Sequence, residues 1–395
     1  MCLAIFISLI YVYYKNTGKI VLAIVFSIGM IYLSRLVFVA RAQEISFLLF
    51  IWEFYWIEKL ISTGKKKYSI LLIILGILLA NFHSSVYPVL FIMYLPYIAL
   101  ILIQKVSKKE FCSIENEKLF WITCGVSLFT GFCSTAGTAP YTDMLKAMKG
   151  TSTTFIGELA QSTWSNNKIF YIGIILAFLS CLGSFRKNKL TDVFYLLGFG
   201  VMAIYTYRCT YFFWLIAGIA MNRVLSNFIE SASILSKTYV KIPVYTSILF
   251  VYLLFAFDSV LWIERQEYVE EDLYPVKVAD YIEKNIDTKT MRIFNHFNYG
   301  SYLEFRGIEA FIDSRSGMFT TEFNPGCTIL EDWLKVYNDV NKYTEVFEKY
   351  KINYAVVENN EKLCLQLTED KSWDIIFTDD NFTLFKEIKD KEEYK

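Results

Sequence analysis

The chain has 395 residues, of which 55% are apolar and 20% charged, and its mean hydropathy is +0.37. This composition excludes a disordered chain, a collagen-like repeat and a disulfide scaffold. The formal net charge is zero, but residues 1–263 carry 22 Lys and Arg against 11 Asp and Glu, while residues 264–395 carry 17 against 28. The charge therefore divides the chain into an apolar, basic part and a polar, acidic part.

Long apolar runs recur through residues 1–263, and a bilayer core of about 30 Å needs roughly 20 apolar residues per helix. We expect about ten spans, at residues 2–14, 20–36, 43–62, 69–80, 86–104, 119–136, 169–184, 190–206, 211–229 and 242–263. The predicted fold of this part is an α-helical polytopic membrane bundle. The first span is short and looks like a span that has lost its beginning.

The loops between these spans differ in charge. One alternate set of loops holds 14 basic residues and the other set holds 5. Because basic residues concentrate on the cytoplasmic side, the first set is predicted to lie in the cytoplasm. The chain start and residues 264–395 are then predicted to lie outside the cell membrane, in a multi-pass protein.

Residues 264–395 read as a soluble α/β domain. Helical periodicity is expected at 274–284, 329–337, 343–350 and 361–368, and strand-like runs occur at 291–294, 310–312, 353–357, 375–377 and 382–385. The last two runs flank a turn-rich segment at 378–381 and predict a hairpin. Strands that alternate with helices favour a small, mostly parallel sheet.

The loops on the predicted outer side gather unusual polar residues. They are Arg41, Asn81, His83, Asp143, Glu158 and Arg208. Two or three Arg with one His on the same side form a candidate lipid-phosphate site, because guanidinium groups bind phosphate oxygens bidentately. Each residue also has a structural alternative: the Arg side chains as headgroup anchors, Asn81 as a helix cap, His83 as an interfacial histidine, and the two acids as solvated loop residues.

Glu53 lies in the middle of a predicted span. It is either buried against Tyr hydroxyls within the bundle or part of a polar pathway, and the sequence does not separate these alternatives. Glu53 and Glu58 together suggest a transporter or flippase as one class of function.

Residues that bind metals or nucleic acids are not indicated. The chain has two His and no Cys-x-x-Cys pair, so we predict no metal site and no cofactor, and a divalent cation remains an open alternative. No phosphate-binding Gly-rich loop or hydrolase motif occurs, and nucleic-acid binding is not expected.

Three short stretches stand out in the acidic part, and the third of them is 373–380. The first contains Tyr299 and Gly300, and the second is an apolar run that ends in Asp313 and Arg315. Ends of parallel strands often carry binding residues. The alternative is an Asp–Arg pair and a Gly turn that stabilise the local fold.

The order of several short motifs resembles the GT-C glycosyltransferases, which include protein mannosyltransferases and the lipid A aminoarabinose transferase. The motifs are Arg41-Ala42-Gln43, Ala80-Asn81-Phe82-His83, Pro140-Tyr141 with Ile156-Gly157-Glu158, Arg208, Asn298-Tyr299-Gly300-Ser301-Tyr302-Leu303 and Phe311-Ile312-Asp313-Ser314-Arg315. The resemblance extends from about residue 35 to 388 and implies a helical bundle with an extracytoplasmic domain. It also implies transfer of a sugar from a polyprenyl-phosphate donor to a glycan or protein acceptor.

The chain departs from that family at its start. GT-C enzymes carry a catalytic acid in the first outer loop, whereas the first complete outward loop here, residues 37–42, holds none. We therefore expect a GT-C-like protein that lacks its N-terminal part. Asp143 and Glu158 are then the candidate catalytic acids, and Arg41, Asn81, His83 and Arg208 the candidate donor-binding residues. The alternative is a non-catalytic scaffold or a binding protein for lipid-linked glycans in envelope polysaccharide assembly.

Overall fold

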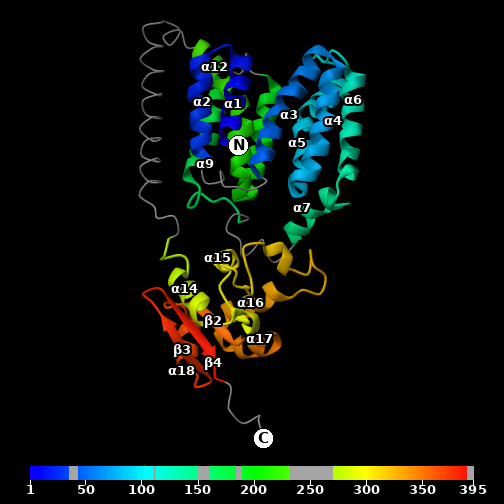
Figure 1. The fold of residues 1–395 in the computed structure, drawn as a ribbon. Helices are drawn as coiled ribbons and strands as arrows, with labels where there is room; N and C mark the ends of the chain where they lie inside the picture. Colours follow the sequence, from blue (N-terminus) through cyan, green and yellow to red (C-terminus); the bar gives the residue numbers. More distant parts are fainter. Residues whose placement is uncertain (35–42, 110–112, 150–159, 184–188, 232–269, 389–395) are drawn as a thin grey trace. The chain divides into compact units, whose positions relative to one another are not determined.

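A computed structural model describes residues 1–34, 43–109, 113–149, 160–183, 189–231 and 270–388 (Figure 1). These residues divide into two compact units, one before residue 232 and one after residue 269. The described part is mostly helical, and its single sheet lies in the second unit. The candidate residues Arg41 and Glu158 and the predicted span 242–263 lie outside the described residues.

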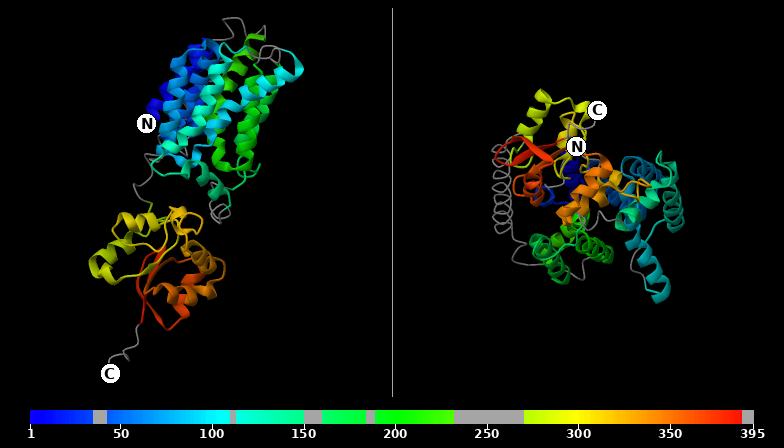
Figure 2. Two further views of the ribbon diagram at one scale, coloured as in Figure 1. Left: turned by 90° about the vertical axis from the view of Figure 1, so that its right-hand side faces the viewer. Right: turned by 90° about the horizontal axis from the view of Figure 1, so that it is seen from below.

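The first unit is a bundle of helices that run roughly along one direction (Figures 1 and 2). Its helices are α1 (Cys2–Thr17), α2 (Ile20–Leu33), α3 (Gln43–Thr63), α4 (Lys66–Phe82), α5 (Val89–Ser107), α6 (Glu117–Phe129), α7 (Ala139–Lys149), α9 (Lys168–Gly183), α10 (Leu190–Tyr205), α11 (Thr210–Phe212) and α12 (Gly218–Ser231). A π-helical turn, η6 (Phe213–Ala217), joins α11 to α12, and 3₁₀ turns η2 (Ser84–Val86), η3 (Thr130–Cys133) and η5 (Tyr207–Cys209) lie between other helices.

The predicted spans among the described residues coincide with helices, but few of these helices are long and apolar enough to cross a membrane. Each predicted span up to 211–229 contains a helix. Among the described residues, two helical segments, Ser84–Ser107 and Tyr207–Asn227, are long and apolar enough to cross a membrane. Buried core helices of soluble proteins have the same length and composition, so these two segments do not by themselves establish a membrane domain.

Apolar side chains form exposed stripes on this bundle. On α4, Ile70, Ile74, Leu78 and Phe82 are all exposed, and their spacing of four residues places them on one helix face. A second stripe follows α9. Its exposed members include Ile172, Ile175, Leu179 and Leu182. Contiguous apolar surface of this kind marks a contact with lipid or with another protein.

Local signals explain several helix ends. Gly18 adopts φ 70° after α1 and donates its backbone N–H to the carbonyl of Tyr14, which is the usual glycine-terminated helix end. Asn116 precedes α6 and accepts a hydrogen bond from the backbone N–H of Leu119. Residues 137–168 were expected to form a loop, but α7 occupies Ala139–Lys149, with Pro140 in its first turn where a missing N–H costs nothing.

The second unit contains helices on both sides of a small sheet (Figure 2). Its longer elements are α14 (Val276–Asn285), β1 (Ile293–Phe294), α15 (Gly300–Phe305), α16 (Ile329–Asn338), α17 (Tyr343–Tyr350), β2 (Tyr354–Glu358), α18 (Lys362–Glu369), β3 (Trp373–Thr378) and β4 (Phe382–Glu387). The predicted helices, the strands at 353–357 and 291–294 and the final hairpin are confirmed within a few residues. Helix α15 was not predicted.

The strand order is β1-β2-β4-β3. Only β1 and β2 pair in parallel, whereas β2–β4 and β3–β4 are antiparallel. The prediction of a mostly parallel sheet is therefore wrong, because the hairpin returns β4 to pair directly with β2. Asp379 supports that return, since its carboxylate accepts the backbone N–H groups of Asn381 and Phe382.

The expected strand at 310–312 is also wrong. The side chain of Asn295 forms hydrogen bonds with the backbone of this segment. Its Oδ1 accepts the N–H of Phe311, and its Nδ2 donates to the carbonyl of Ile312. These groups are thus satisfied without a neighbouring strand.

Alternating strand residues build two cores. Tyr354, Val356, Phe382 and Leu384 pack with residues of α14 and α15. Their neighbours in the strands point to the opposite face. On that face, the Phe294 ring contacts Phe347 of α17.

Candidate functional site

Polar residues meet at one end of the first unit, where α3 begins and α4 and α10 end. The first turn of α3 presents Gln43 and Ser46, three residues apart and hence on one helix face. Arg208 lies in the turn after α10, and His83 follows α4. Both side chains reach the first turn of α3.

Arg208 contacts Gln43. Its Nη2 donates to Oε1 of Gln43 at 3.2 Å. Among the described residues, no carboxylate lies within ion-pair distance of this half-buried guanidinium. The other amide atom of Gln43, Nε2, is buried and donates no hydrogen bond to the described part of the chain. A partly buried charge without a counter-charge is costly, so this place favours an anion.

His83 contacts Ser46 on the same face of α3. Its Nδ1 and the Ser46 Oγ share a hydrogen bond of 2.8 Å. Burial, and then the positive charge of Arg208, lower the pKa of His83 to about 4. The ring is therefore neutral near physiological pH, and it has one N–H to donate.

The term donor cluster, for hydrogen-bond donors, denotes the residues Arg208, Gln43 and His83. The guanidinium and the amide nitrogen offer hydrogen-bond donors, and the neutral imidazole of His83 lies close to the charge of Arg208. No acid of the described chain neutralises the cluster. Phosphate oxygens accept several hydrogen bonds and carry negative charge, so they match this arrangement.

Asp143 contacts the segment that follows His83. It sits on α7 and accepts a hydrogen bond of 2.6 Å from Ser84, the residue after His83. The carboxylate is half-buried and has no basic partner in the described residues. The carboxylate is thus held by the residue that follows His83 in the chain.

Asn81 has a structural position. Its Nδ2 donates to the carbonyls of Ile77 and Cys133, and its Oδ1 accepts the backbone N–H of Thr135. These bonds join the end of α4 to the segment after η3. The amide is already occupied, in line with the helix-capping alternative.

Sequence reasoning missed three members of this region. Gln43 was noted in a motif but given no role, and Ser46 and Ser84 were not considered. One signal was present: Gln43 and Ser46 are polar residues three positions apart at the start of an apolar run, which places them on one face.

In the second unit, the predicted motif residues stabilise the fold. The Tyr299 hydroxyl is buried and donates to the carbonyl of Val356 at 2.8 Å. Asp313 is buried and accepts the backbone N–H and Nε of Arg315. Gly300 packs so tightly against residue 312 that a side chain there would clash. These contacts agree with the structural alternative for the four residues.

A second polar group is buried at the opposite end of the bundle. Arg223 forms an ion pair with Glu58 at 2.9 Å and lies 3.5 Å from Asp192, which is fully buried. Lys189 approaches Glu58 at 3.7 Å. Glu58 is therefore part of an ion-pair network, which weakens the case for a transport pathway.

Glu53 differs from Glu58. It is completely buried, and neither carboxylate oxygen has a hydrogen-bond partner in the described chain. Of the two alternatives for Glu53, contact with Tyr hydroxyls is therefore not made as a hydrogen bond within the described residues.

Among the described residues, no group of three or more His, Cys, Asp or Glu side chains is arranged to hold a metal ion. Neither protein-family models nor curated proteins give a match to this sequence.

Proposed function

We propose that this chain is a multi-pass membrane protein that binds the phosphate of a polyprenyl-linked sugar at the donor cluster and transfers the sugar to a glycan or protein acceptor outside the cytoplasm. The observation that carries the proposal is the guanidinium of Arg208, which has Gln43 as its partner and no carboxylate of the described residues within ion-pair distance. The exposed apolar stripes on α4 and α9 support a lipid environment for the bundle.

Hydrogen bonds at the two ends of the bundle support the predicted assignment of its loops to two sides. At one end, the backbone N–H of Tyr207 donates to Ala160. At the other, the N–H of Glu115 donates to Ile61, and Lys19 donates to Ser226. Each bond thus joins a loop to another loop, or to the end of a span, that the prediction assigns to the same side of the membrane. The basic loops lie at the second end, which the positive-inside rule assigns to the cytoplasm. The acidic second unit is extracytoplasmic in this proposal.

The transfer step follows from these positions. An acceptor hydroxyl attacks the anomeric carbon of the sugar while its proton passes to a carboxylate, for which Asp143 is the described candidate. The bond from the anomeric carbon to the phosphate oxygen breaks, and the polyprenyl phosphate leaves with the electron pair. Arg208, Gln43 and His83 stabilise the charge on the leaving phosphate. Configuration at the anomeric carbon is inverted.

A binding protein without catalysis is the second candidate. It is favoured by the same donor cluster, since binding of the lipid phosphate alone needs Arg208 and Gln43 but no acid. Asp143 separates the two candidates because it has a role only in transfer.

The experiment uses membranes from cells that lack this protein and have been labelled with a radioactive hexose. The full chain, or Asp143→Asn, is added back, and movement of label from lipid-soluble to lipid-insoluble glycan is measured. Wild type is expected to transfer label, and Asp143→Asn to be slower by about 10²–10⁴-fold, the usual contribution of a general base. Wild-type membranes that transfer no label, while the protein still binds polyprenyl phosphate, would favour the binding protein.

A further inference from the structure

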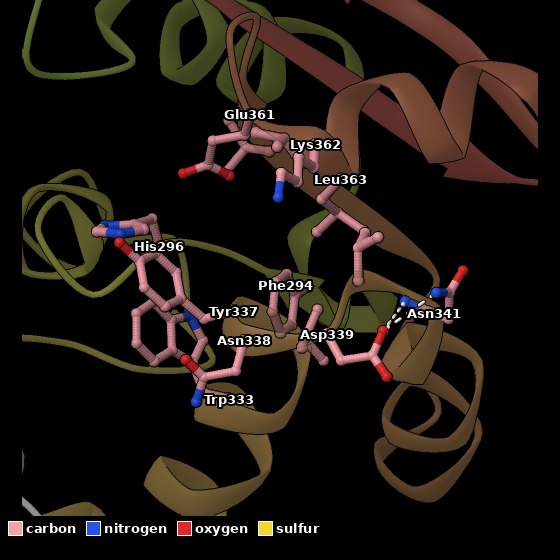
Figure 3. Close-up of a pocket in the computed structure, with 14 residues that line it drawn as sticks. Phe294, His296, Trp333, Tyr337, Asn338, Asp339, Asn341, Glu361, Lys362 and Leu363 are labelled. Atoms are coloured by element: carbon pink, nitrogen blue, oxygen red, sulfur yellow. Dashed lines mark hydrogen bonds between the residues drawn. The ribbon is translucent and has the colours of Figure 1, made fainter.

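A cavity of about 500 Å³ lies within the second unit (Figure 3). It is lined by residues that follow the parallel strands β1 and β2 and by residues of α16. His296 follows β1, while Glu361 and Lys362 follow β2. The volume falls within the roughly 300–1,000 Å³ typical of small-molecule sites. Ligands of α/β sheets bind at the carboxyl ends of parallel strands, which is where this cavity lies.

One wall of the cavity is aromatic. The rings of Trp333 and Tyr337 stack with centroids 5.1 Å apart and an angle of 18°. The Trp333 Nε1 donates to the carbonyl of Asn295, so that ring is fixed. Tyr337 is 59% exposed and borders the cavity. Trp333 is therefore held in place, while Tyr337 is exposed to the cavity. This arrangement suits a ligand that packs flat against a ring.

The opposite wall is polar. Figure 3 shows Glu361 and Lys362 across the cavity from Trp333 and Asn338. Within the described chain, neither the Glu361 carboxyl nor the Lys362 ammonium has a hydrogen-bond or ion-pair partner. Burial, and then the neighbouring Glu358, raise the pKa of Glu361 to about 7. Near neutral pH this carboxyl can both donate and accept hydrogen bonds.

His296 contributes a donor of defined position. The backbone N–H of Asn298 donates to its Nδ1 at 3.1 Å, so the proton of the neutral ring lies on Nε2. Burial lowers the pKa of His296 to about 4, which keeps the ring neutral. The cavity thus combines an aromatic face with one ammonium, the carboxyl groups of Glu361 and Asp339, the amides of Asn338 and Asn341, and one imidazole N–H.

We propose that this cavity binds a saccharide of one or two pyranose rings, whose C–H face packs against Tyr337 and whose hydroxyl groups bond to Glu361, Lys362 and Asn338. Hydroxyl groups both donate and accept, as the polar wall requires. An apolar ligand would leave Glu361 and Lys362 unpaired, and a polyanion would meet the carboxylates of Glu361 and Asp339. The proposal does not depend on the transfer reaction, because every residue involved belongs to the second unit.

The test uses the full chain in lauryldimethylamine oxide, a detergent without a sugar headgroup. Saturation-transfer difference NMR is recorded with maltose, cellobiose, mannobiose and N,N′-diacetylchitobiose. At least one of them is expected to bind. Tyr337→Ala and Glu361→Ala should each weaken that binding about five- to tenfold, as expected for the loss of ring packing or of a hydrogen bond.

Matched controls come from the same unit. Phe305→Ala removes an exposed aromatic ring and Glu369→Ala removes an exposed acid of α18, and neither residue borders the cavity. Both should bind as wild type does, and circular dichroism checks that every variant is folded. Failure of all four sugars to bind, or unchanged binding by both cavity variants, would overturn the proposal. Arg208→Gln should leave sugar binding unchanged, which separates this proposal from that of the donor cluster.

Discussion

The guanidinium of Arg208 donates a hydrogen bond to the amide oxygen of Gln43, while the amide nitrogen of Gln43 is buried and has no partner among the residues that the structure describes. The amide therefore orients the cation without neutralising it and leaves a second donor beside it. A carboxylate in the same position would have satisfied Arg208 within the chain. The choice of an amide is what leaves this end of the bundle able to bind an anion.

Gln43→Glu tests that relationship. The new carboxylate can accept the same hydrogen bond from Arg208, but it also pairs with the positive charge and repels a phosphate. We expect binding of undecaprenyl phosphate in nanodiscs to weaken about tenfold or more, since hydrogen bonds to charged groups contribute about 1.5–3 kcal/mol. Gln104→Glu, at the end of α5, adds the same charge outside the cluster and should bind normally. Equal binding by Gln43→Glu and wild type would refute the role given to the amide.

Gly300→Ala tests the packing of the second unit. A β-carbon on Gly300 would stand 1.9 Å from the carbonyl oxygen of Ile312, and a backbone atom cannot move aside cheaply. We expect a loss of about 3 kcal/mol in the free energy of unfolding, the upper range for overpacking. Gly317→Ala meets its nearest atom at 3.6 Å and should be almost neutral. Thermal unfolding of the full chain measures both, and similar melting temperatures for the two variants would be inconsistent with this packing.

Asp332→Asn tests an ion-pair network on α16. The carboxylate is 1% exposed and accepts hydrogen bonds from Lys335, Lys349 and Tyr350. Burial raises its pKa, but the bonds from Lys335 and its other donors outweigh burial and hold the pKa below the usual 3.8. The stabilisation is thus present above pH 3.8 and is lost as the pH falls through the lower, folded-state value.

At neutral pH, Asp332→Asn should therefore lower the free energy of unfolding by about 2–3 kcal/mol. The difference from wild type should shrink as the pH falls below 3.8. Asp374→Asn removes an exposed acid of β3 and should change stability by less than about 0.5 kcal/mol. Melting curves recorded across acidic pH decide the point, and a constant difference at every pH would count against the network.

Arg223→Leu tests the buried charges of the bundle. The substitution leaves Glu58 and Asp192 without their shared cation, and breaking a buried pair costs about 3–5 kcal/mol. Lys189→Met removes an exposed cation from the same Glu58 and should cost less than about 1 kcal/mol. Unfolding of the full chain in detergent compares the two. Equal losses of stability in Arg223→Leu and Lys189→Met would contradict the larger contribution assigned to the buried cation.

The sequence predicted the helices of the first unit well because long apolar runs leave few alternatives. It placed helix starts closely, as at Ile20 and Leu190. It missed α7 because that helix is short and amphipathic and lies in a polar stretch. In the second unit, the hairpin was recognised from its turn residues, but strand pairing depends on contacts far apart in the chain, and the parallel sheet was wrong.

The candidate site was predicted in part. Sequence reasoning selected His83, Asp143 and Arg208 from their common side of the bundle, and the structure brings His83 and Arg208 to the same turn of α3. It could not show that Asn81 is occupied within the chain, because the partners lie more than fifty residues away. The cavity beside His296 was also missed, since its aromatic and polar walls come from separate segments.

The central claim is that the donor cluster binds a lipid phosphate. The most direct test measures binding of undecaprenyl phosphate and of uncharged undecaprenol to the full chain in nanodiscs, with wild type, Arg208→Gln and Lys168→Gln. Lys168 is an exposed cation that begins α9 and serves as the matched charge control. We expect wild type and Lys168→Gln to prefer the phosphate, and Arg208→Gln to lose about ten- to a hundredfold of that preference. Equal binding of the phosphate and the alcohol by wild type, or an unchanged preference in Arg208→Gln, would contradict the claim.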